Sequence, residues 1–191
     1  MPPNPQPLGL GLTPYKATQL LTTTSLALLL GSTTWASVAV MPSLIAAPIS
    51  TYAKLSVFRG LIIRANSILP PVFIATVAGL GYLAGTSFSG GARGNYAVAM
   101  AAVLAALGLQ VKVLPLNKAM VEVVDQGRGK EDQGEEGNRR IGELLVLNWG
   151  RVALSAFAFG LSLWELGVVR RAVVVAMTPA PVSRGLFGRA G

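Results

Sequence analysis

Four long stretches of this sequence carry no Lys, Arg, Asp or Glu, and they limit the chain to a fold that can bury them. These stretches cover residues 17–53, 65–92, 94–111 and, more briefly, 152–164. A helix of about 20 apolar residues crosses the hydrocarbon core of a bilayer. The first three stretches meet this requirement, and the fourth does so if Arg151 or Glu165 faces protein instead of lipid. We therefore predict an all-α integral membrane protein, a four-helix bundle.

The predicted membrane domain is a single unit of residues 17–169, and its spans cover about residues 18–41, 68–84, 96–114 and 147–169. Pro42 is expected to end the first span, and Pro115 to end or kink the third. Residues 1–16 are predicted to be disordered, and the basic tail of residues 170–191 to be loosely ordered. An even number of spans places both termini on the same side of the membrane.

Two connections carry most of the charge. Residues 50–66 have apolar side chains at helical spacing together with three cations, which predicts an amphipathic segment at the membrane interface. Pro70 and Pro71 then fit the first turn of the second span. Residues 125–140, DQGRGKEDQGEEGNRR, combine charges of both signs with glycine, so we expect a solvated, flexible loop between helices three and four.

The sequence contains no cysteine and no histidine. Disulfides, thiolate catalysis, histidine-ligated haem and the usual zinc sites are therefore excluded, and no cofactor is predicted. The net charge of +8 does not indicate a nucleic-acid partner, because the cations flank the apolar stretches as membrane anchors do. The expected partner, apart from any substrate, is the lipid bilayer.

One face of the fourth predicted helix is polar. At steps of three, four, seven and three residues, it carries Asn148, Arg151, Ser155, Ser162 and Glu165. At about 100° per residue, the first four lie within a narrow sector and Glu165 lies at its edge. An isolated charge at membrane depth costs about 2.5–3.5 kcal/mol on insertion scales. These side chains should therefore face the bundle interior, a watery cavity or the interface.

Two interpretations of this polar face remain open. In the first, Asn117, which follows helix three, joins Asn148 and Arg151 in a polar pocket among the helices, with Trp149 as an aromatic wall. In the second, Trp149 and Arg151 only anchor the helix at the interface, and Asn117 caps a helix end after Pro115. Spacing alone does not decide between them.

Four short motifs give the chain a resemblance to a known family. They are GSTTWASVAVMPSL in helix one, Arg64 shortly before the proline-led PPVFIATVAGL, LPLNKAM with Pro115 and Asn117, and the tryptophan-glycine-containing ELLVLNWGRVALSAFAFGLSLWEL. Over residues 17–169 the chain resembles the anthrone oxygenases, small four-helix membrane proteins of fungal aromatic-polyketide pathways, which are related to a broad family of bacterial and fungal membrane proteins.

The resemblance implies a membrane-bound oxygenase that needs neither metal nor flavin. It would convert an anthrone-type aromatic polyketide to the anthraquinone with dioxygen, in secondary-metabolite biosynthesis and in an internal membrane such as the endoplasmic reticulum. The implied catalytic residues are Asn117 and Asn148, as donors to a substrate oxyanion, and Arg151, whose charge would lower the substrate's pKa. The implied substrate-binding residues are Trp35, Trp149, Ser155 and Arg64.

The sequence departs from the family pattern at two positions. The family often carries an Asn and an Arg four and seven residues beyond the tryptophan of the last helix, where this chain has Ala153 and Ala156. Asn148 and Arg151 lie in the same turns. A non-catalytic scaffold or small-molecule-binding protein of the same family is therefore an alternative, and a homo-oligomer stays open. A transporter is disfavoured because the sequence shows no inverted repeat.

Overall fold

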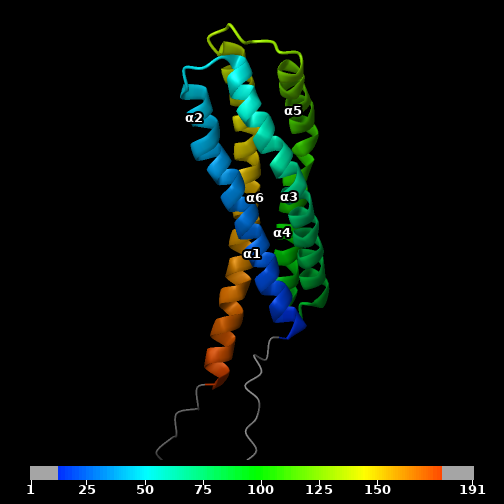
Figure 1. Ribbon diagram of the computed structural model, residues 1–191. Coiled ribbons are helices and arrows are strands. Elements are labelled where there is room, and N and C mark those ends of the chain that lie inside the picture. The colour runs from blue at the N-terminus through cyan, green and yellow to red at the C-terminus, as the bar shows by residue number, and fades with distance from the viewer. Residues whose placement is uncertain (1–12, 178–191) are drawn as a thin grey trace, which may run out of the picture.

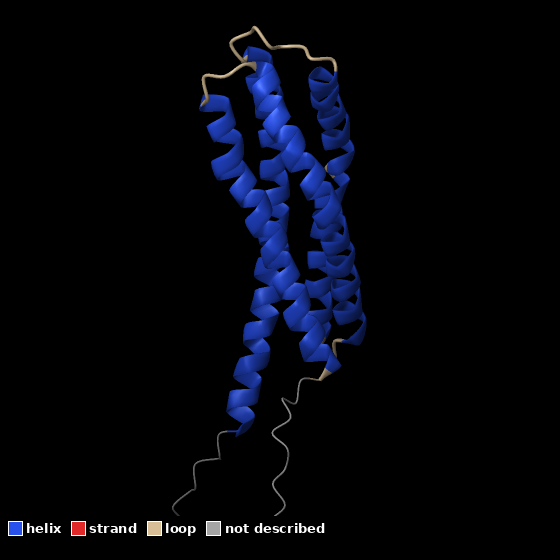
Figure 2. Ribbon diagram, in the orientation of Figure 1, coloured by secondary structure: helices blue, strands red, loops and turns tan. Residues whose placement is uncertain are grey.

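The computed structural model describes residues 13–177, with side chains as far as Gly167. Every regular element in this part of the chain is a helix, and the helices form four long rods that pack lengthwise (Figures 1 and 2). The rods span Pro14–Ala46, Thr51–Thr86, Gly90–Asp125 and Glu135–Gly167. Each is long and apolar enough to cross a membrane. The predicted all-α bundle of four membrane-spanning helices is confirmed.

The rods are longer than the predicted spans. With 33 or 36 residues each, they measure about 50–54 Å, whereas the hydrocarbon core of a bilayer is about 30 Å thick. The first rod already begins at Pro14, where the side chain of Thr13 caps α1 (Pro14–Trp35). The last rod, α6 (Glu135–Met177), begins twelve residues before the predicted residue 147.

The two ends of the described chain lie at the same end of the bundle, as four spans require (Figure 1). We call this the terminal end, and the opposite one the loop end. Most of the predicted disordered segment, residues 1–12, and most of the predicted basic tail, residues 178–191, lie outside the described residues.

Prolines do not end the helices where the sequence predicted. Pro42 does not stop the first rod, because it lies in the first turn of α2 (Met41–Ala46). α2 continues α1 through one π-helical turn, η1 (Ala36–Val40). Pro115 does not end the third rod either, since it lies inside α5 (Gln110–Asp125). The break in that rod comes at Leu109, directly after α4 (Gly90–Gly108).

The second rod is one continuous helix, α3 (Thr51–Thr86), which contains Pro70 and Pro71. The predicted interfacial segment, residues 50–66, is therefore the N-cap and first half of α3 and not a separate element. Membrane bundles tolerate internal proline because neighbouring helices and side chains compensate the backbone groups that it frees. The expectation that proline marks a helix end, which holds well for helices in water, therefore placed the start of the second helix wrongly.

Two separate hydrophobic clusters hold the rods together. The terminal-side cluster is built from Leu26, Leu29, Phe73, Leu80, Leu83, Tyr96, Ala99, Ala102, Val103 and Ala158. The loop-side cluster is built from Met41, Leu55, Phe58, Val113, Met120, Val123, Val124, Ile141 and Leu144. Because residues of all four rods enter each cluster, the rods are fixed to one another at two heights.

The charged connection before α6 is shorter and more structured than predicted. Residues 126–134 fold over the start of α3, where Asp132 Oδ1 accepts from the N–H of Thr51 at 2.8 Å and the carbonyl of Gly129 accepts from Tyr52 at 2.8 Å. Hydrogen bonds from Thr51, first from its side chain and then from its N–H, hold the pKa of the Asp132 carboxyl below its usual range. The connection therefore caps α3.

A buried lysine closes the loop end of the bundle. The Lys54 ammonium is covered and donates to the carbonyl of Ile45 at 3.1 Å and to Asn138 Oδ1 at 2.6 Å. Gly134 lies against it with φ of 83°, and an added Cβ there would collide with the Ile49 carbonyl. Glycine is needed at this turn because it alone combines positive φ with so little space.

Candidate functional site

A cavity of about 410 Å³ lies between the two hydrophobic clusters, and all four rods contribute to its wall. Its volume falls within the range of about 300–1,000 Å³ that is usual for small-molecule sites. Most of the wall is apolar. α3 supplies a large share of it through Phe58, Leu61, Ile62, Leu69 and Phe73.

Backbone irregularities of three rods meet at this cavity. Its lining includes Ala36 and Val40 of η1, Pro70 of α3, and Gln110, which directly follows the break at Leu109. A π-helical turn inserts an extra residue, and an internal proline removes a backbone hydrogen bond, so each bends or widens a helix locally. We attribute the space between the rods to these three coincident defects.

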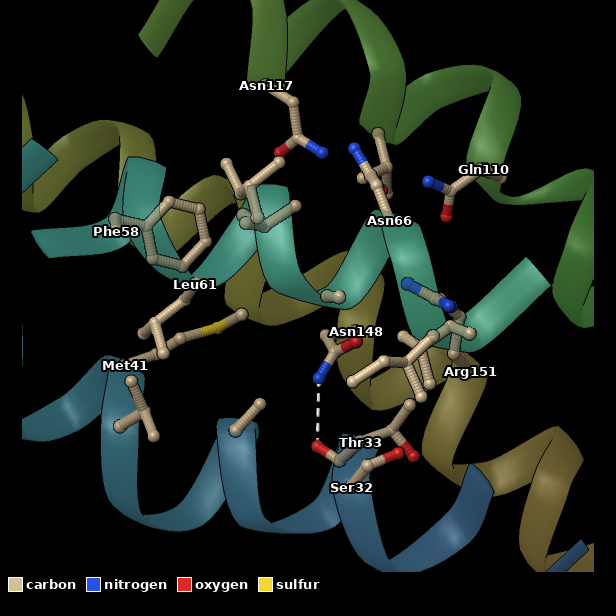
Figure 3. Close-up of a pocket in the computed structure, with 18 of the residues that line it drawn as sticks. Ser32, Thr33, Met41, Phe58, Leu61, Asn66, Gln110, Asn117, Asn148 and Arg151 are labelled. Carbon is tan, nitrogen blue, oxygen red and sulfur yellow. Dashed lines mark hydrogen bonds between the residues drawn. The ribbon is translucent and has the colours of Figure 1, made fainter. Parts of the chain in front are cut away.

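Polar side chains gather on one part of the wall. Figure 3 shows Asn66, Gln110 and Asn117 near one another at the α3–α5 side, with Arg151 of α6 beyond them. Three atoms of this group are fully buried without a hydrogen-bond partner among the described residues: Gln110 Oε1, Asn117 Oδ1 and Arg151 Nε. Buried polar atoms are normally paired, and leaving one unpaired costs about 1–3 kcal/mol. Two free acceptors and one free donor are therefore available to a ligand or to water in this cavity.

Among the described residues that line the cavity, Arg151 is the one cation, and it lies midway along the span Glu135–Gly167. The three ion pairs found among the described residues all lie toward the loop end and do not involve it. Its guanidinium instead lies 5.9 Å from the centre of the Phe73 ring. A cation–π contact compensates only part of the cost of a buried charge. The cavity is therefore electrostatically suited to an anion or to a group that becomes anionic.

Asn148 connects α6 to the π-helical region of the first rod. Its Nδ2 donates to the carbonyl of Thr33 at 2.9 Å and to Ser37 Oγ at 2.7 Å, and Figure 3 shows the first of these bonds. Both of its N–H groups are thus occupied, so Asn148 cannot donate to a ligand in this arrangement. Its role is to hold the cavity wall in place at η1.

A second cavity of about 480 Å³ adjoins the first between α3 and α5. Ile62, Asn66 and Asn117 line both cavities. The wall of the second cavity also carries charged and polar side chains, namely Lys118, Glu122, Asp125 and Gln126. The pair of amides, Asn66 and Asn117, therefore separates an apolar chamber from a polar one.

The structure brings four of the seven predicted site residues to the first cavity, namely Trp35, Asn117, Asn148 and Arg151. It does not bring the other three there, namely Arg64, Trp149 and Ser155. Trp149 follows Asn148 but points about 100° further round the helix, and it is 47% exposed on the outer surface. Trp149 thus fits the anchor interpretation, whereas Arg151 and Asn117 fit the pocket interpretation. That the four lining residues act on a substrate stays a prediction.

The polar face of α6 points inward, as one prediction required. Asn148, Ser155, Ser162 and Glu165 are all buried. Glu165 lies near the terminal end, where it accepts from Asn95 Nδ2 at 2.5 Å. It is outside the cavity and cannot serve a ligand there.

Sequence reasoning missed two amides of the site, Asn66 and Gln110. Gln110 could have been found from its position, because it is an amide near the end of the charge-free stretch of residues 94–111. It also precedes Asn117 by seven residues, which places both on one face of α5. Asn66 precedes Pro70, which was predicted to lie in the first turn of the second span, so the position of Asn66 inside α3 was not foreseen.

A metal site is not formed by this arrangement. Within the part of the chain that the structure describes, no group of three or more His, Cys, Asp or Glu side chains could hold a metal ion. The cavity offers amides, a guanidinium and aromatic rings, which are groups that orient and stabilise an organic ligand.

Comparison with known proteins identifies the family. The family model described as anthrone oxygenase matches residues 58–161, which is more than half of the chain. The chain belongs to the anthrone oxygenase family. The matched segment contains Asn66, Gln110, Asn117, Asn148 and Arg151, which are the amide and guanidinium side chains of the cavity wall. No curated protein and no solved structure matches the chain.

Proposed function

We propose that this protein is a cofactor-independent oxygenase that converts an anthrone-type aromatic polyketide to the anthraquinone with dioxygen. The observation that carries the proposal is the Arg151 guanidinium, which lies without an acidic partner among the described residues at the wall of a mainly apolar cavity. Membership of the anthrone oxygenase family supports the reaction class. The resemblance described above supports a role in secondary metabolism, in an internal membrane such as the endoplasmic reticulum.

The reaction mainly requires a site that stabilises negative charge on the substrate. The methylene of an anthrone is acidic because its anion is delocalised over two rings and onto the carbonyl oxygen. Arg151 stabilises this oxyanion, and a cation in a poorly solvated site acts more strongly than one in water. It thereby lowers the pKa of the C–H acid.

The anion itself reduces dioxygen. It transfers one electron to dioxygen, and the resulting radical pair combines to form a carbon–oxygen bond. Protonation gives a hydroperoxide, which loses water to leave the new carbonyl. The net reaction is anthrone plus dioxygen giving anthraquinone plus water, so atoms and electrons balance without an added reductant. One atom of dioxygen is retained in the product.

The amides orient the substrate and border the route of its proton. Gln110 and Asn117 offer carbonyl oxygens that accept from phenolic hydroxyl groups, which the unpartnered state of these atoms supports. Asn66 and Asn117 also border the second cavity, where a water molecule can take the released proton toward the carboxylate of Glu122. Asn148 positions η1 and contributes no hydrogen bond to the oxyanion.

The two alanines at family motif positions do not weaken this proposal. Ala153 and Ala156 are exposed on the outer side of α6, so an Asn and an Arg placed there would not reach the cavity of this protein. Asn148 and Arg151 repeat the same spacing of three residues and face the interior. The amide and the cation are therefore present in the bundle, five residues earlier along the helix.

The test is incorporation of labelled oxygen. Purified protein in vesicles would receive 1,8-dihydroxyanthrone under ¹⁸O₂ with a metal chelator, and protein-free vesicles would give the spontaneous rate. We expect one ¹⁸O atom in the quinone at a rate above that background and unaffected by chelator. The Arg151→Met protein should fall to background, whereas Arg139→Met, which alters an exposed arginine of the same helix, should not.

A non-catalytic binding protein is the competing function, because an apolar cavity with unpartnered amides suits any flat phenolic ligand. The same experiment separates the two functions. Saturable binding of 1,8-dihydroxyanthraquinone without any label above background would establish binding and refute the oxygenase.

A further inference from the structure

The first cavity is closed along the axis of the bundle. Toward the terminal end, Phe73 belongs both to its wall and to the terminal-side cluster. Toward the loop end, its wall is formed by Met41, Phe58, Val113 and Leu144 of the loop-side cluster. Interiors of this kind are packed as densely as organic crystals, so a three-ring molecule cannot pass through them. Access must therefore come from the side.

One side of the cavity opens onto the outer surface. Trp35 of α1 and Ile68 of α3 line the cavity and yet are each 62% exposed. Residues that belong both to the wall and to the surface mark the edge of an opening. Both residues lie inside rods that are long and apolar enough to cross a membrane. The surface around this opening therefore faces lipid.

The two helices that flank the opening are in contact at another height. An added Cβ at Gly79 of α3 would collide with the side chain of Thr22 of α1, so the helices pack closely there. Toward the loop end they part around the cavity, and Figure 3 shows Ser32, Thr33 and Met41 of the first rod facing Phe58 and Leu61 of α3 across it. The close contact between Gly79 and Thr22 therefore fixes the two helices to each other on the terminal side of the opening.

We propose that the cavity is loaded sideways from the bilayer, through the opening between α1 and α3 that Trp35 and Ile68 flank. The ligand is a flat, lipophilic aromatic molecule that has already partitioned into the membrane. Tryptophan is favoured where apolar and polar surroundings meet, and its ring offers a face on which such a molecule slides. The polar second cavity, with Lys118, Glu122 and Asp125 on its wall, serves water and protons. Only the identity of the ligand rests on the proposed function.

The absence of cysteine from the chain makes a direct test of the route practical. Val113→Cys places a single thiol on the cavity wall at a position that is 3% exposed. In vesicles, this thiol would be challenged with N-phenylmaleimide, which is lipid-soluble and aromatic, and separately with a membrane-impermeant sulfonated maleimide. The measured quantity is the rate of thiol modification, so no anthrone and no activity is needed.

Two substitutions of the same kind distinguish the opening from the general surface. Ile68→Trp fills the opening, whereas Ile74→Trp adds the same bulk to a position on the same helix that is 70% exposed and does not line the cavity. We expect Ile68→Trp to slow modification by N-phenylmaleimide about tenfold, with Ile74→Trp unchanged. Trp35→Ala, which widens the opening, should accelerate it.

Three results would overturn the lateral route. The first is faster modification by the impermeant reagent than by N-phenylmaleimide, which would place access on the aqueous side. The second is equal rates in the Ile68→Trp and Ile74→Trp proteins, and the third is slower modification after Trp35→Ala. Thermal unfolding of each variant would verify that the bundle is intact. The two tests are independent. Failure of the lateral route would not change the result of the oxygen-labelling experiment, and absence of oxygenase activity would not change the result of the thiol-modification experiment.

Discussion

Replacing Arg151 by Met should stabilise the protein and abolish its activity at the same time. An arginine at the centre of a spanning helix costs about 2.5–3.5 kcal/mol on insertion scales. The contact of its guanidinium with Phe73, 5.9 Å from the ring centre, returns about 0.5–2 kcal/mol. Because no acidic partner compensates the remainder within the described residues, Met, which has a similar length, should raise the free energy of unfolding by about 0.5–3 kcal/mol.

The assay is unfolding in mixed detergent micelles at increasing denaturant, followed by circular dichroism or by tryptophan fluorescence. Arg139→Met is the matched control, since Arg139 forms an exposed ion pair with Glu143 at 3.0 Å and its loss should change stability by no more than about 0.5 kcal/mol. An Arg151→Met protein clearly less stable than the parent would refute the reasoning. It would mean that the guanidinium already has a partner that stabilises the ligand-free bundle.

Three further predictions concern the framework around the site. Asn148→Ala removes the side-chain donor to the Thr33 carbonyl and to Ser37 Oγ and should lower the free energy of unfolding by about 1–3 kcal/mol; an unchanged unfolding midpoint would show that Asn148 does not hold the first rod at η1. Gly79→Ala should destabilise by about 1–3 kcal/mol because its Cβ collides with Thr22, whereas Gly31→Ala, with open space around it, should not, and equal midpoints for the two would contradict the close packing. Hydrogen bonds from the first residue of α3 lower the pKa of Asp132 below its ordinary value of 3.8; its stabilising contribution is complete above that value and is lost as the pH falls through the lower, folded one. Asp132→Asn should therefore remove part of the acid dependence of unfolding, and identical pH profiles would show that this cap contributes nothing.

The number and approximate position of the helices were predictable because charge is so costly inside a membrane. Stretches without charge have few alternatives: residues 17–53 contain most of the first rod, and residues 65–92 contain the second part of the second rod. The inward direction of the polar face of α6 followed from the same cost. The spacing of Asn148 and Arg151 places both on one face of the helix. Because a charge facing lipid is costly, this face was expected to point into the bundle.

The helix boundaries were less predictable because they depend on long-range packing. Pro70 and Pro115 read locally as helix starts or ends, but neighbouring rods keep α3 and α5 helical through them. The π-helical turn that lines the cavity leaves no comparable signal in the sequence. The side chain that donates a hydrogen bond to the Thr33 carbonyl next to this turn comes from Asn148, which is more than a hundred residues away along the chain. Trp149 directly follows Asn148 in the sequence, yet Asn148 is buried and Trp149 is exposed. Neighbouring positions in a helix can therefore face opposite surroundings, and closeness along the chain does not predict a shared site.

The most direct measurement of the central claim is a structure of the protein in lipid with 1,8-dihydroxyanthraquinone bound. The claim is that the cavity between the two clusters is the substrate site and that Arg151 faces the oxygen that bears the charge. The account predicts the tricycle inside this cavity, with one of its oxygens within hydrogen-bond distance of Arg151 and a hydroxyl directed at Gln110 or Asn117. A ligand bound elsewhere, against the outward Trp149 or beside Glu165, with this cavity empty, would contradict it.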